Sequence, residues 1–288
     1  MSIRTILVPL FGGEIDGRGL EAALGAAQRF GAHVNALFVR IDPRDAIPVI
    51  GEGVSPAVID QLTAAAAAEM DRRSQAGRAA FEAVCARSGI AIGDAPHERG
   101  TASAGWIEVT GRRDVMLPKK ARVSDLTVLC RPDEHTPPEL DADLERVLFG
   151  AGRPLLIVPP GGAPNANRTV ALAWNDSTEA ARALAGALPF LEAADAVHVL
   201  CAKTWRTAAD ADLDLIRYLE WRGIACTRHA VSPEGESVGA ALLAAAAETG
   251  ADLLVMGGYG RTRLSELVLG GVTRHVLAHS PLPLLMSH

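Results

Sequence analysis

Short apolar runs alternate with longer amphipathic stretches along the whole chain. Residues 5–9 and 126–130 are nearly all apolar, which is the pattern of parallel strands covered on both faces. The longer stretch at residues 16–30 is rich in Ala and Leu and predicts a helix. Strands that alternate with helices form parallel sheets with right-handed crossovers. The pattern therefore predicts an α/β fold.

The alternation continues to the end of the sequence. In the first part, strands are predicted at residues 5–9, 34–39, 105–109, 126–130 and 155–158, and helices at residues 16–30, 56–88, 112–122 and 141–149. In the second part, strands are predicted at residues 170–173, 197–200, 224–230, 252–256 and 283–286, and helices at residues 178–188, 209–221, 234–248 and from residue 271 onward. A loop is expected at residues 42–56, and a short helical excursion at residues 261–269.

The two parts are repeats of one unit. Three segments of the first part match segments of the second in the same order: residues 4–9 match 168–173, residues 125–130 match 252–257, and residues 147–156 match 276–285. Matches in a constant order indicate a duplication. A Pro-, Gly- and Asn-rich stretch at residues 159–168 reads as the linker. We therefore expect two tandem open parallel-sheet, Rossmann-like domains, at residues 1–160 and 168–288.

Glycines follow a buried strand near the end of the sequence. The strand ends at Met256, and Gly257, Gly258 and Gly260 come directly after it, so the chain can turn sharply and a ligand can approach main-chain N–H groups. A second pair, Gly270 and Gly271, precedes Val272 and Thr273, which we expect in the first turn of a new helix. The positive end of that helix would face the loop, where an anion could bind.

The spacing Gly257-x-x-Gly260, nine residues, Gly270 closely resembles the nucleotide motif of the universal stress proteins, small α/β domains with ATP-binding members. This sequence departs from the family's motif at Gly271, where the family has a hydroxyl residue. Thr273 offers a hydroxyl two residues later. The other interpretation of these glycines is a tight turn without a ligand.

The resemblance implies an adenine nucleotide, ATP, as the ligand of the second domain, with no metal beyond the Mg²⁺ that a nucleotide carries. The family's first strand, which here ends at Ala173, is followed by an aspartate that contacts the nucleoside, and Asn175 stands at that position. The family's adenine is held by main-chain groups at the end of the second strand, which falls on Val199, and Arg261 would face the phosphates. Without a ligand, Asn175 is a turn residue, Val199 a core residue and Arg261 a solvated side chain.

The first repeat lacks the same glycine loop. At the corresponding strand end it has Cys130-Arg-Pro-Asp-Glu-His, in which Pro132 removes an N–H group and Asp133 repels an anion. Its last strand, residues 155–158, and the last strand of the second repeat, residues 284–286, are apolar runs. An open apolar edge favours pairing. We therefore expect the two domains to pair within the chain, as family members pair in dimers, and a homodimer is a further expectation.

Composition narrows the classes of function. The chain has 288 residues, a net charge of −6 and 4% aromatic residues, so neither a basic surface nor a stacking platform for nucleic acid is expected. No apolar run reaches the roughly 18 residues of a membrane span, and a cytoplasmic protein is expected. The four cysteines lack C-x-x-C spacing. Among the histidines, His275 and His279 form the one pair spaced four residues apart on a predicted helix. Two ligands without a third are weak evidence for a zinc site.

No nucleophile or acid–base motif is present, so no catalytic residue is predicted and we do not expect an enzyme. The leading hypothesis is a tandem universal stress protein that binds an adenine nucleotide in its second domain and acts as a stress-response binding module. One alternative is a ligand-free protein-interaction module. Another is an ATP-cleaving adenylating enzyme, whose Ser-Gly-Gly-x-Asp-Ser loop residues 11–16 resemble only superficially, because both serines are missing.

Overall fold

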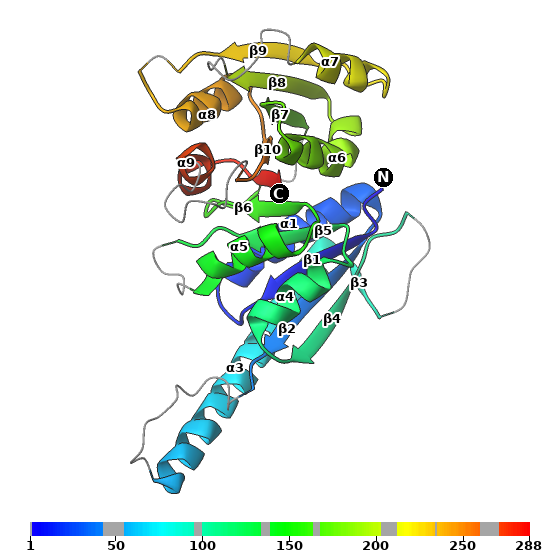
Figure 1. Ribbon diagram of the computed structural model, residues 1–288. Coiled ribbons are helices and arrows are strands. Elements are labelled where there is room, and N and C mark those ends of the chain that lie inside the picture. Colours follow the sequence, from blue (N-terminus) through cyan, green and yellow to red (C-terminus); the bar gives the residue numbers. More distant parts are fainter. Residues whose placement is uncertain are drawn as a thin grey trace. The chain divides into compact units, whose positions relative to one another are not determined.

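Strands and helices alternate in the computed structural model, which describes residues 2–42, 55–94, 100–133, 139–163, 168–202, 212–233, 235–259 and 271–288. Apart from the first two residues, the chain divides into two compact units, Ile3–Cys130 and Arg131–His288. Each unit, called here the N-terminal and the C-terminal unit, consists of a sheet with helices packed on it (Figure 1). The predicted α/β class is confirmed.

The elements of the N-terminal unit within the described ranges are β1 (Thr5–Leu10), α1 (Ile15–Phe30), β2 (His33–Arg40), α3 (Pro56–Ser88), β3 (Ala91–Ile92), β4 (Ser103–Thr110), α4 (Arg113–Ala121) and β5 (Leu126–Cys130). The strands lie in the order β3-β4-β2-β1-β5, and these neighbours are parallel. Because β2 lies on one side of β1 and β5 on the other, the winding reverses between β1 and β5.

The elements of the C-terminal unit within the described ranges are α5 (Glu139–Gly150), β6 (Leu155–Val158), β7 (Thr169–Trp174), α6 (Thr178–Glu192), β8 (Ala196–Ala202), α7 (Leu213–Glu220), β9 (Thr227–Val231), α8 (Val238–Glu248), β10 (Leu253–Gly257), α9 (Gly271–His279) and β11 (Leu284–Ser287). The strands lie in the order β6-β11-β10-β7-β8-β9. They are parallel except for β6 against β11. The winding reverses between β7 and β10.

The last strands of the two repeats are neighbours in this unit. β6 and β11 are antiparallel, with Leu284 opposite Ile157 and Met286 opposite Leu155. The division of the chain by packing therefore falls before Arg131, because α5 and β6 belong to the same compact unit as the second repeat. The predicted domain limits at residues 160 and 168 are boundaries between sequence repeats, whereas this division reflects which residues pack together. The packing therefore does not test those limits, and they stay a prediction.

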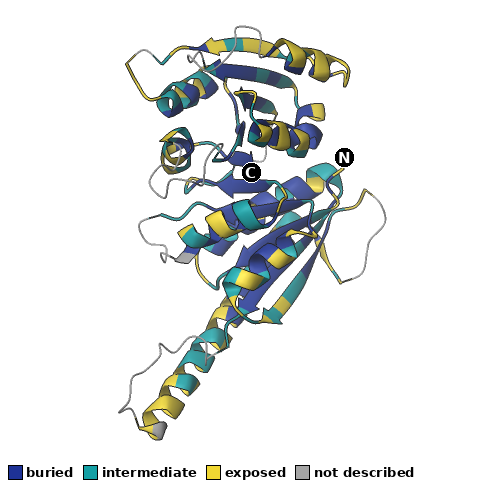
Figure 2. Cartoon of the chain, viewed as in Figure 1, coloured by how far each residue is buried: buried dark blue, intermediate teal, exposed yellow. Residues whose placement is uncertain are grey.

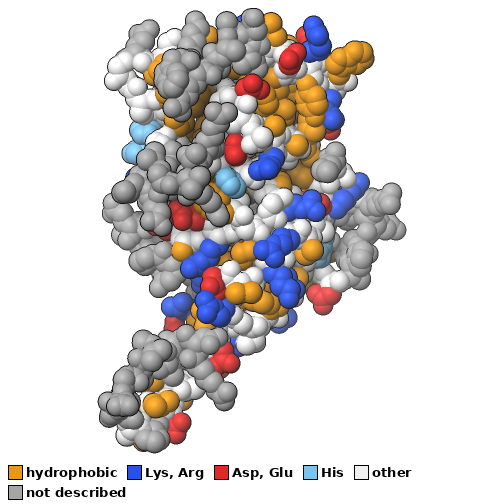
Figure 3. Space-filling view, in the orientation of Figure 1, with side chains coloured by type: hydrophobic (Ala, Val, Ile, Leu, Met, Phe, Trp, Pro, Cys, Tyr) orange, Lys and Arg blue, Asp and Glu red, His pale blue; other side chains and the backbone are white. Residues whose placement is uncertain are grey.

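Apolar side chains from the strands and the inner helix faces form the core of each unit (Figure 2). In α6, Ala183, Leu184, Leu188 and Phe190 are buried, and burying one such large side chain contributes roughly 1.5–3 kcal/mol. The N-terminal half of α3 differs, since Val58, Ile59 and Leu62 are exposed. On the face shown in Figure 3, Lys and Arg side chains are interspersed with Asp and Glu, and hydrophobic side chains also reach the surface.

Several element boundaries differ from the predicted ones. α8 begins at Val238 instead of residue 234, because the Ser237 hydroxyl caps it by accepting the Ala240 N–H at 3.1 Å, while Gly235 has a φ of 81° before the helix. β9 begins at Thr227 instead of residue 224. α7 begins at Leu213, and the predicted start at residue 209 lies outside the described residues. Residues 43–54 of the predicted loop at residues 42–56 also lie outside them, as does the predicted helical excursion at residues 261–269.

Candidate functional site

The carboxyl ends of β7 and β10 lie side by side where the winding of the C-terminal unit reverses. Leu253 is opposite Val170 and Val255 opposite Leu172, so the ends of both strands reach the same edge. Ligands of open α/β sheets bind at such an edge. The predicted site residues Ala173 and Met256 lie near these two strand ends, and both are buried. Their side chains are core, so a ligand could reach only their main-chain groups.

The loop after β7 is closed by its own side chains. Asn175 Oδ1 accepts hydrogen bonds from the Ser177 N–H at 3.3 Å and from the Ser177 hydroxyl at 2.8 Å. The Ser177 hydroxyl in turn accepts the Ala180 N–H at 3.1 Å and caps α6. Asp176 has a φ of 57°, in the left-handed region. This geometry is the turn and cap that we weighed against a ligand role, and nucleoside recognition by Asn175 stays a prediction.

Gly257 and Gly258 are packed so closely against neighbouring residues that a side chain would not fit without movement of those neighbours. A Cβ at Gly257 would lie 2.6 Å from the main-chain nitrogen of Ala180 at the start of α6. A Cβ at Gly258 would lie 3.1 Å from both Leu148 Cδ2 and Met286 Cε, and the Gly258 N–H donates to Ser287 O at 2.8 Å. The loop therefore approaches α6 closely without a ligand, and main-chain binding at Gly257 stays a prediction.

The start of α9 is joined to the end of β10 by one hydrogen bond. The Tyr259 N–H donates to Thr273 Oγ1 at 3.3 Å, and Tyr259 has a φ of 53°. Gly271 is the first residue of α9, as predicted, and a Cβ built on it comes within 4 Å of no heavy atom of the described residues. Val272 is half-buried and Thr273 is buried. The first N–H groups of α9, which have no partner within the helix, thus lie beside the strand end.

Three predicted site residues, Gly260, Arg261 and Gly270, lie outside the described residues. The predicted position of Val199 at a strand end is wrong. β8 continues to Ala202, and Val199 is fully buried between Leu172 of β7 and Arg228 of β9. The strand is longer because its pairing with β9 extends past Leu200. The predicted contact with adenine at Val199 stays a prediction.

The structure adds charged and aromatic groups that the sequence did not point to. Glu179 lies at the start of α6 against Gly257. Burial opposes its ionisation, but N–H and hydroxyl donors of the first turn and nearby His288 together lower its pKa. His288 Nδ1 donates to Gly258 O at 3.0 Å, and its ring meets Phe149 edge-on with centroids 4.7 Å apart. These contacts join residues far apart in sequence, so no local pattern signals them.

The N-terminal unit fills the corresponding loop with a carboxylate. Asp16 accepts the Phe11 N–H at 2.9 Å, the Gly12 N–H at 2.7 Å and the Gly13 N–H at 3.3 Å. Burial raises its pKa to about 6, against the opposing effects of these three donors and of Arg113. The N–H groups after β1 are therefore already used, and they are not available to a phosphate of the adenylating-enzyme type.

No group of three or more His, Cys, Asp or Glu side chains within the described ranges is arranged to hold a metal ion. The rings of His275 and His279 stack with centroids 4.4 Å apart, and His279 Nδ1 donates to His275 O at 2.9 Å. None of the four cysteines forms a disulfide bond, and Cys85, Cys130 and Cys201 are buried. Burial raises the pKa of Cys85 to about 11, which makes this thiol a poor nucleophile at neutral pH.

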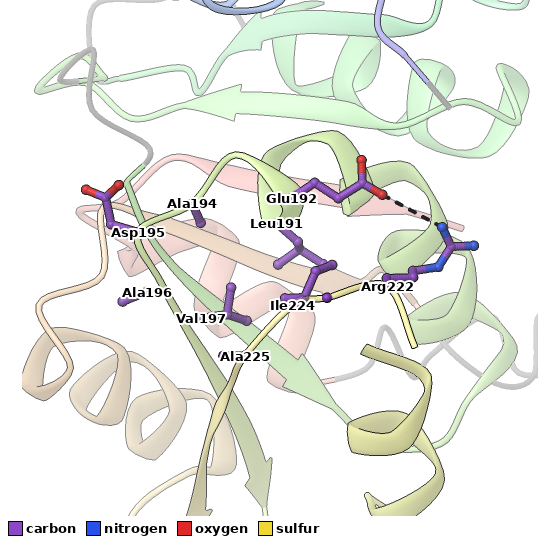
Figure 4. Close-up of a pocket in the computed structure, with 10 residues that line it drawn as sticks. Leu191, Glu192, Ala194, Asp195, Ala196, Val197, Arg222, Ile224 and Ala225 are labelled. Atoms are coloured by element: carbon purple, nitrogen blue, oxygen red, sulfur yellow. Dashed lines mark ion pairs between the residues drawn. The ribbon is translucent and has the colours of Figure 1, made fainter. Parts of the chain in front are cut away.

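A pocket of about 240 Å³ lies at the opposite, amino-terminal ends of β8 and β9. Leu191, Val197 and Ile224 form its apolar wall, and Glu192 pairs with Arg222 across its rim at 3.7 Å (Figure 4). The volume is below the roughly 300–1,000 Å³ typical of small-molecule sites. It contains none of the predicted site residues.

A parallel sheet whose winding reverses beside a glycine turn and a helix start defines an open, Rossmann-like α/β domain. The model of the universal stress protein family matches residues 166–288, so this part of the chain is similar to that family. The resemblance stated from the glycine spacing is thereby confirmed. No helix in the described ranges combines the length and the apolar character needed to cross a membrane.

Solved structures extend the likeness in fold to the whole chain. A universal stress protein from Archaeoglobus fulgidus is 20% identical with a TM-score of 0.69, over 98% of this chain and 97% of that one. A functionally unknown protein from Pseudomonas aeruginosa is 16% identical with a TM-score of 0.54, over 99% of this chain and 92% of that one. At these identities the likeness shows the fold. A comparison with curated proteins finds no match.

Proposed function

We propose that residues 168–288 bind an adenine nucleotide, with ATP as the ligand, and that the chain is a stress-response binding module and not an enzyme. The observation that carries this proposal is the hydrogen bond from the Tyr259 N–H to Thr273 Oγ1. It holds the start of α9 beside the end of β10, at the edge where the winding reverses. A phosphate would meet there the N–H groups of Gly271, Val272 and Thr273 and the positive end of the helix.

The nucleoside would lie toward the ends of β7 and β8, near Ala173 and Asn175. Glu179 places a negative charge at the same edge, which disfavours an anion unless a cation such as the nucleotide's own Mg²⁺ lies between them. We therefore expect ATP to bind more tightly with Mg²⁺ than without it. A cytoplasmic location and a homodimer stay predictions.

Gly271 offers a direct test because, within the described residues, no heavy atom lies within 4 Å of its Cβ position. Replacing Gly271 by Ser restores the hydroxyl that the family has at this position. One added hydrogen bond contributes about 0.5–1.5 kcal/mol. In calorimetric titrations of the full chain, ATP should bind to one site, and Gly271→Ser should tighten binding by roughly two- to tenfold.

Gly271→Asp is the matched control. An acidic residue in the first turn stabilises the helix itself but repels a phosphate. Gly271→Asp should therefore abolish ATP binding without lowering the unfolding temperature. Because the chain is proposed not to be an enzyme, the wild type incubated with ATP should accumulate no ADP or AMP. If the wild type gives no heat with ATP, or if both variants bind as the wild type does, the nucleotide proposal fails and the ligand-free interaction module becomes the better account.

A further inference from the structure

Arg131 follows β5 and reaches the far end of α9. Its N–H donates to Val158 O at 2.7 Å, which fixes its main chain beside β6. Its guanidinium Nη1 donates to Leu277 O at 2.9 Å and to Ser280 O at 2.7 Å. The side chain is half-buried, and burial lowers the pKa of its guanidinium, which is still protonated at neutral pH.

These contacts close the carboxyl end of α9. The last four carbonyl groups of a helix have no partner within the helix. Val276 O accepts the Ser280 N–H at 2.9 Å, and Leu277 O and Ser280 O are the acceptors of Arg131. A cation at this end also meets the negative end of the helix dipole, and hydrogen bonds from a charged donor are stronger than neutral ones.

α9 depends on such contacts because it is short. It has nine residues, and isolated helices shorter than about 12–15 residues are marginal in water. Thr273 holds its first turn to Tyr259, and its middle packs on α8, where a Cβ on Gly239 would come within 2.9 Å of His275 Cβ. Arg131 supplies the third attachment, at the end opposite the candidate phosphate site.

We propose that Arg131 is a positioning residue for nucleotide phosphates and acts through α9. This inference rests on the proposed function of the C-terminal unit. A nine-residue helix is about 13 Å long, so Arg131 does not touch a ligand at Gly271. When the two repeats are aligned, Arg131 of the first corresponds to Gly258 of the second. The first repeat thus has an arginine in place of a loop glycine, and we infer that this arginine supports the binding site of the second repeat.

The test compares ATP with adenosine on the full chain. Arg131→Gln removes the charge, Arg131→Lys keeps it, and Arg217→Gln makes the same charge change at an exposed position of α7. Arg131→Gln should weaken ATP binding by about three- to tenfold and leave adenosine binding unchanged, because only the phosphates meet α9. Arg131→Lys should recover most of the loss, and Arg217→Gln should bind as the wild type does.

Hydrogen exchange of the α9 amides gives a second measurement that needs no ligand. Exchange at residues 276–280 should be faster in Arg131→Gln than in the wild type. The inference is overturned if ATP affinity is unchanged, or if ATP and adenosine affinities fall together, since that is a general loss of structure. If the wild type binds no ATP, the proposed function and the phosphate role both fail, and faster exchange would then identify Arg131 only as the anchor of α9.

Discussion

The same strand end is packed in opposite ways in the two repeats. β5 ends in Cys130, whose thiol donates to Ile15 O at 3.5 Å and lies near Gly19 of α1. β10 ends in Gly257, against the start of α6, where the position of Gly19 is taken by Ala183. In the first repeat the strand thus ends in a side chain that contacts the helix, whereas in the second it ends in a glycine that packs against Glu179 and the main chain of Ala180. Only the second arrangement leaves bare main chain at the strand end.

The loop after β1 in the first repeat and the loop after β7 in the second repeat also differ in how their N–H groups are satisfied. In the first repeat, the Asp16 carboxylate is buried and accepts the loop N–H groups, so this loop contains its own anion. In the second repeat, Ala180 corresponds to Asp16, and the neutral side chains of Asn175 and Ser177 close the turn. The comparison teaches that a buried carboxylate accepts the N–H groups of the loop after the first strand in the first repeat, whereas neutral side chains close the corresponding loop in the second repeat.

The largest expected effect is the pH dependence of Asp16. Its folded pKa is raised to about 6 from 3.8, mainly by burial. The folded state therefore binds the proton more tightly than the unfolded chain, so the stability it contributes is present below about pH 4 and lost as the pH rises through 6. Each pKa unit corresponds to about 1.4 kcal/mol. As the pH rises from 3 to 8, the free energy of unfolding of Asp16→Asn should therefore increase by about 3 kcal/mol relative to that of the wild type.

Urea unfolding at a series of pH values measures this difference. At each pH, the free energy of unfolding of the wild type is subtracted from that of Asp16→Asn. The difference no longer contains the titration of the other groups, because the two proteins share them. A difference that does not change with pH would show that Asp16 has an ordinary pKa, and the contrast between the two loops would then lose its electrostatic basis.

A smaller effect is expected from transferring the side chain of the first repeat to the second. Gly257→Cys places a Cβ 2.6 Å from the Ala180 nitrogen, which is main chain and cannot move aside cheaply. Overpacking of this kind costs about 2 kcal/mol in the free energy of unfolding. Gly271→Cys is the control, since its Cβ meets no heavy atom of the described residues within 4 Å, and it should change stability by less than about 0.5 kcal/mol. Equal stabilities in urea would refute the packing argument.

The smallest effect concerns a histidine pair that only the second repeat contains. His198 Nδ1 lies 2.9 Å from His229 Nε2, and Asn35 occupies the position of His198 in the first repeat by strand register. Burial and then His229 lower the pKa of His198, so the unfolded chain binds more protons near pH 6. Stability should therefore fall as the pH drops below about 6.5.

His229→Asn tests this pair. The variant should lose less stability than the wild type between pH 7 and pH 5, in thermal unfolding at matched ionic strength. The sign is opposite to that of Asp16, so the two groups are separable in one pH series. A steeper fall in the variant would contradict the assignment.

The sequence predicts the fold well because its signals are local. Apolar runs and Ala-rich stretches specify β1, α1, β5 and α3 to within a residue or two. Boundaries fail where a cap or a sheet partner decides them: Ser237 sets the start of α8, and pairing with β9 carries β8 past Val199.

The candidate site is predicted less completely because its contacts are long-range. Glycine spacing locates Gly257 and Gly271, and the helix start at Gly271 is as predicted. The role of Arg131 could not be predicted, because its acceptors, one in the last turn of α9 and one directly after it, lie 146 and 149 residues away. Asp16 was noted only as part of a loop that resembles another motif, since its burial and raised pKa arise from tertiary packing.

The antiparallel pairing of β6 with β11 sets an order on biosynthesis. β6 leaves the ribosome long before β11, and Leu155, Leu156 and Ile157 cannot form these antiparallel pairs until Leu284, Leu285 and Met286 are made. Unpaired strand edges in incomplete chains promote aggregation, and non-local pairings form slowly. The nascent chain therefore passes through a stage in which a chaperone that covers residues 155–158 would raise the yield of folded protein.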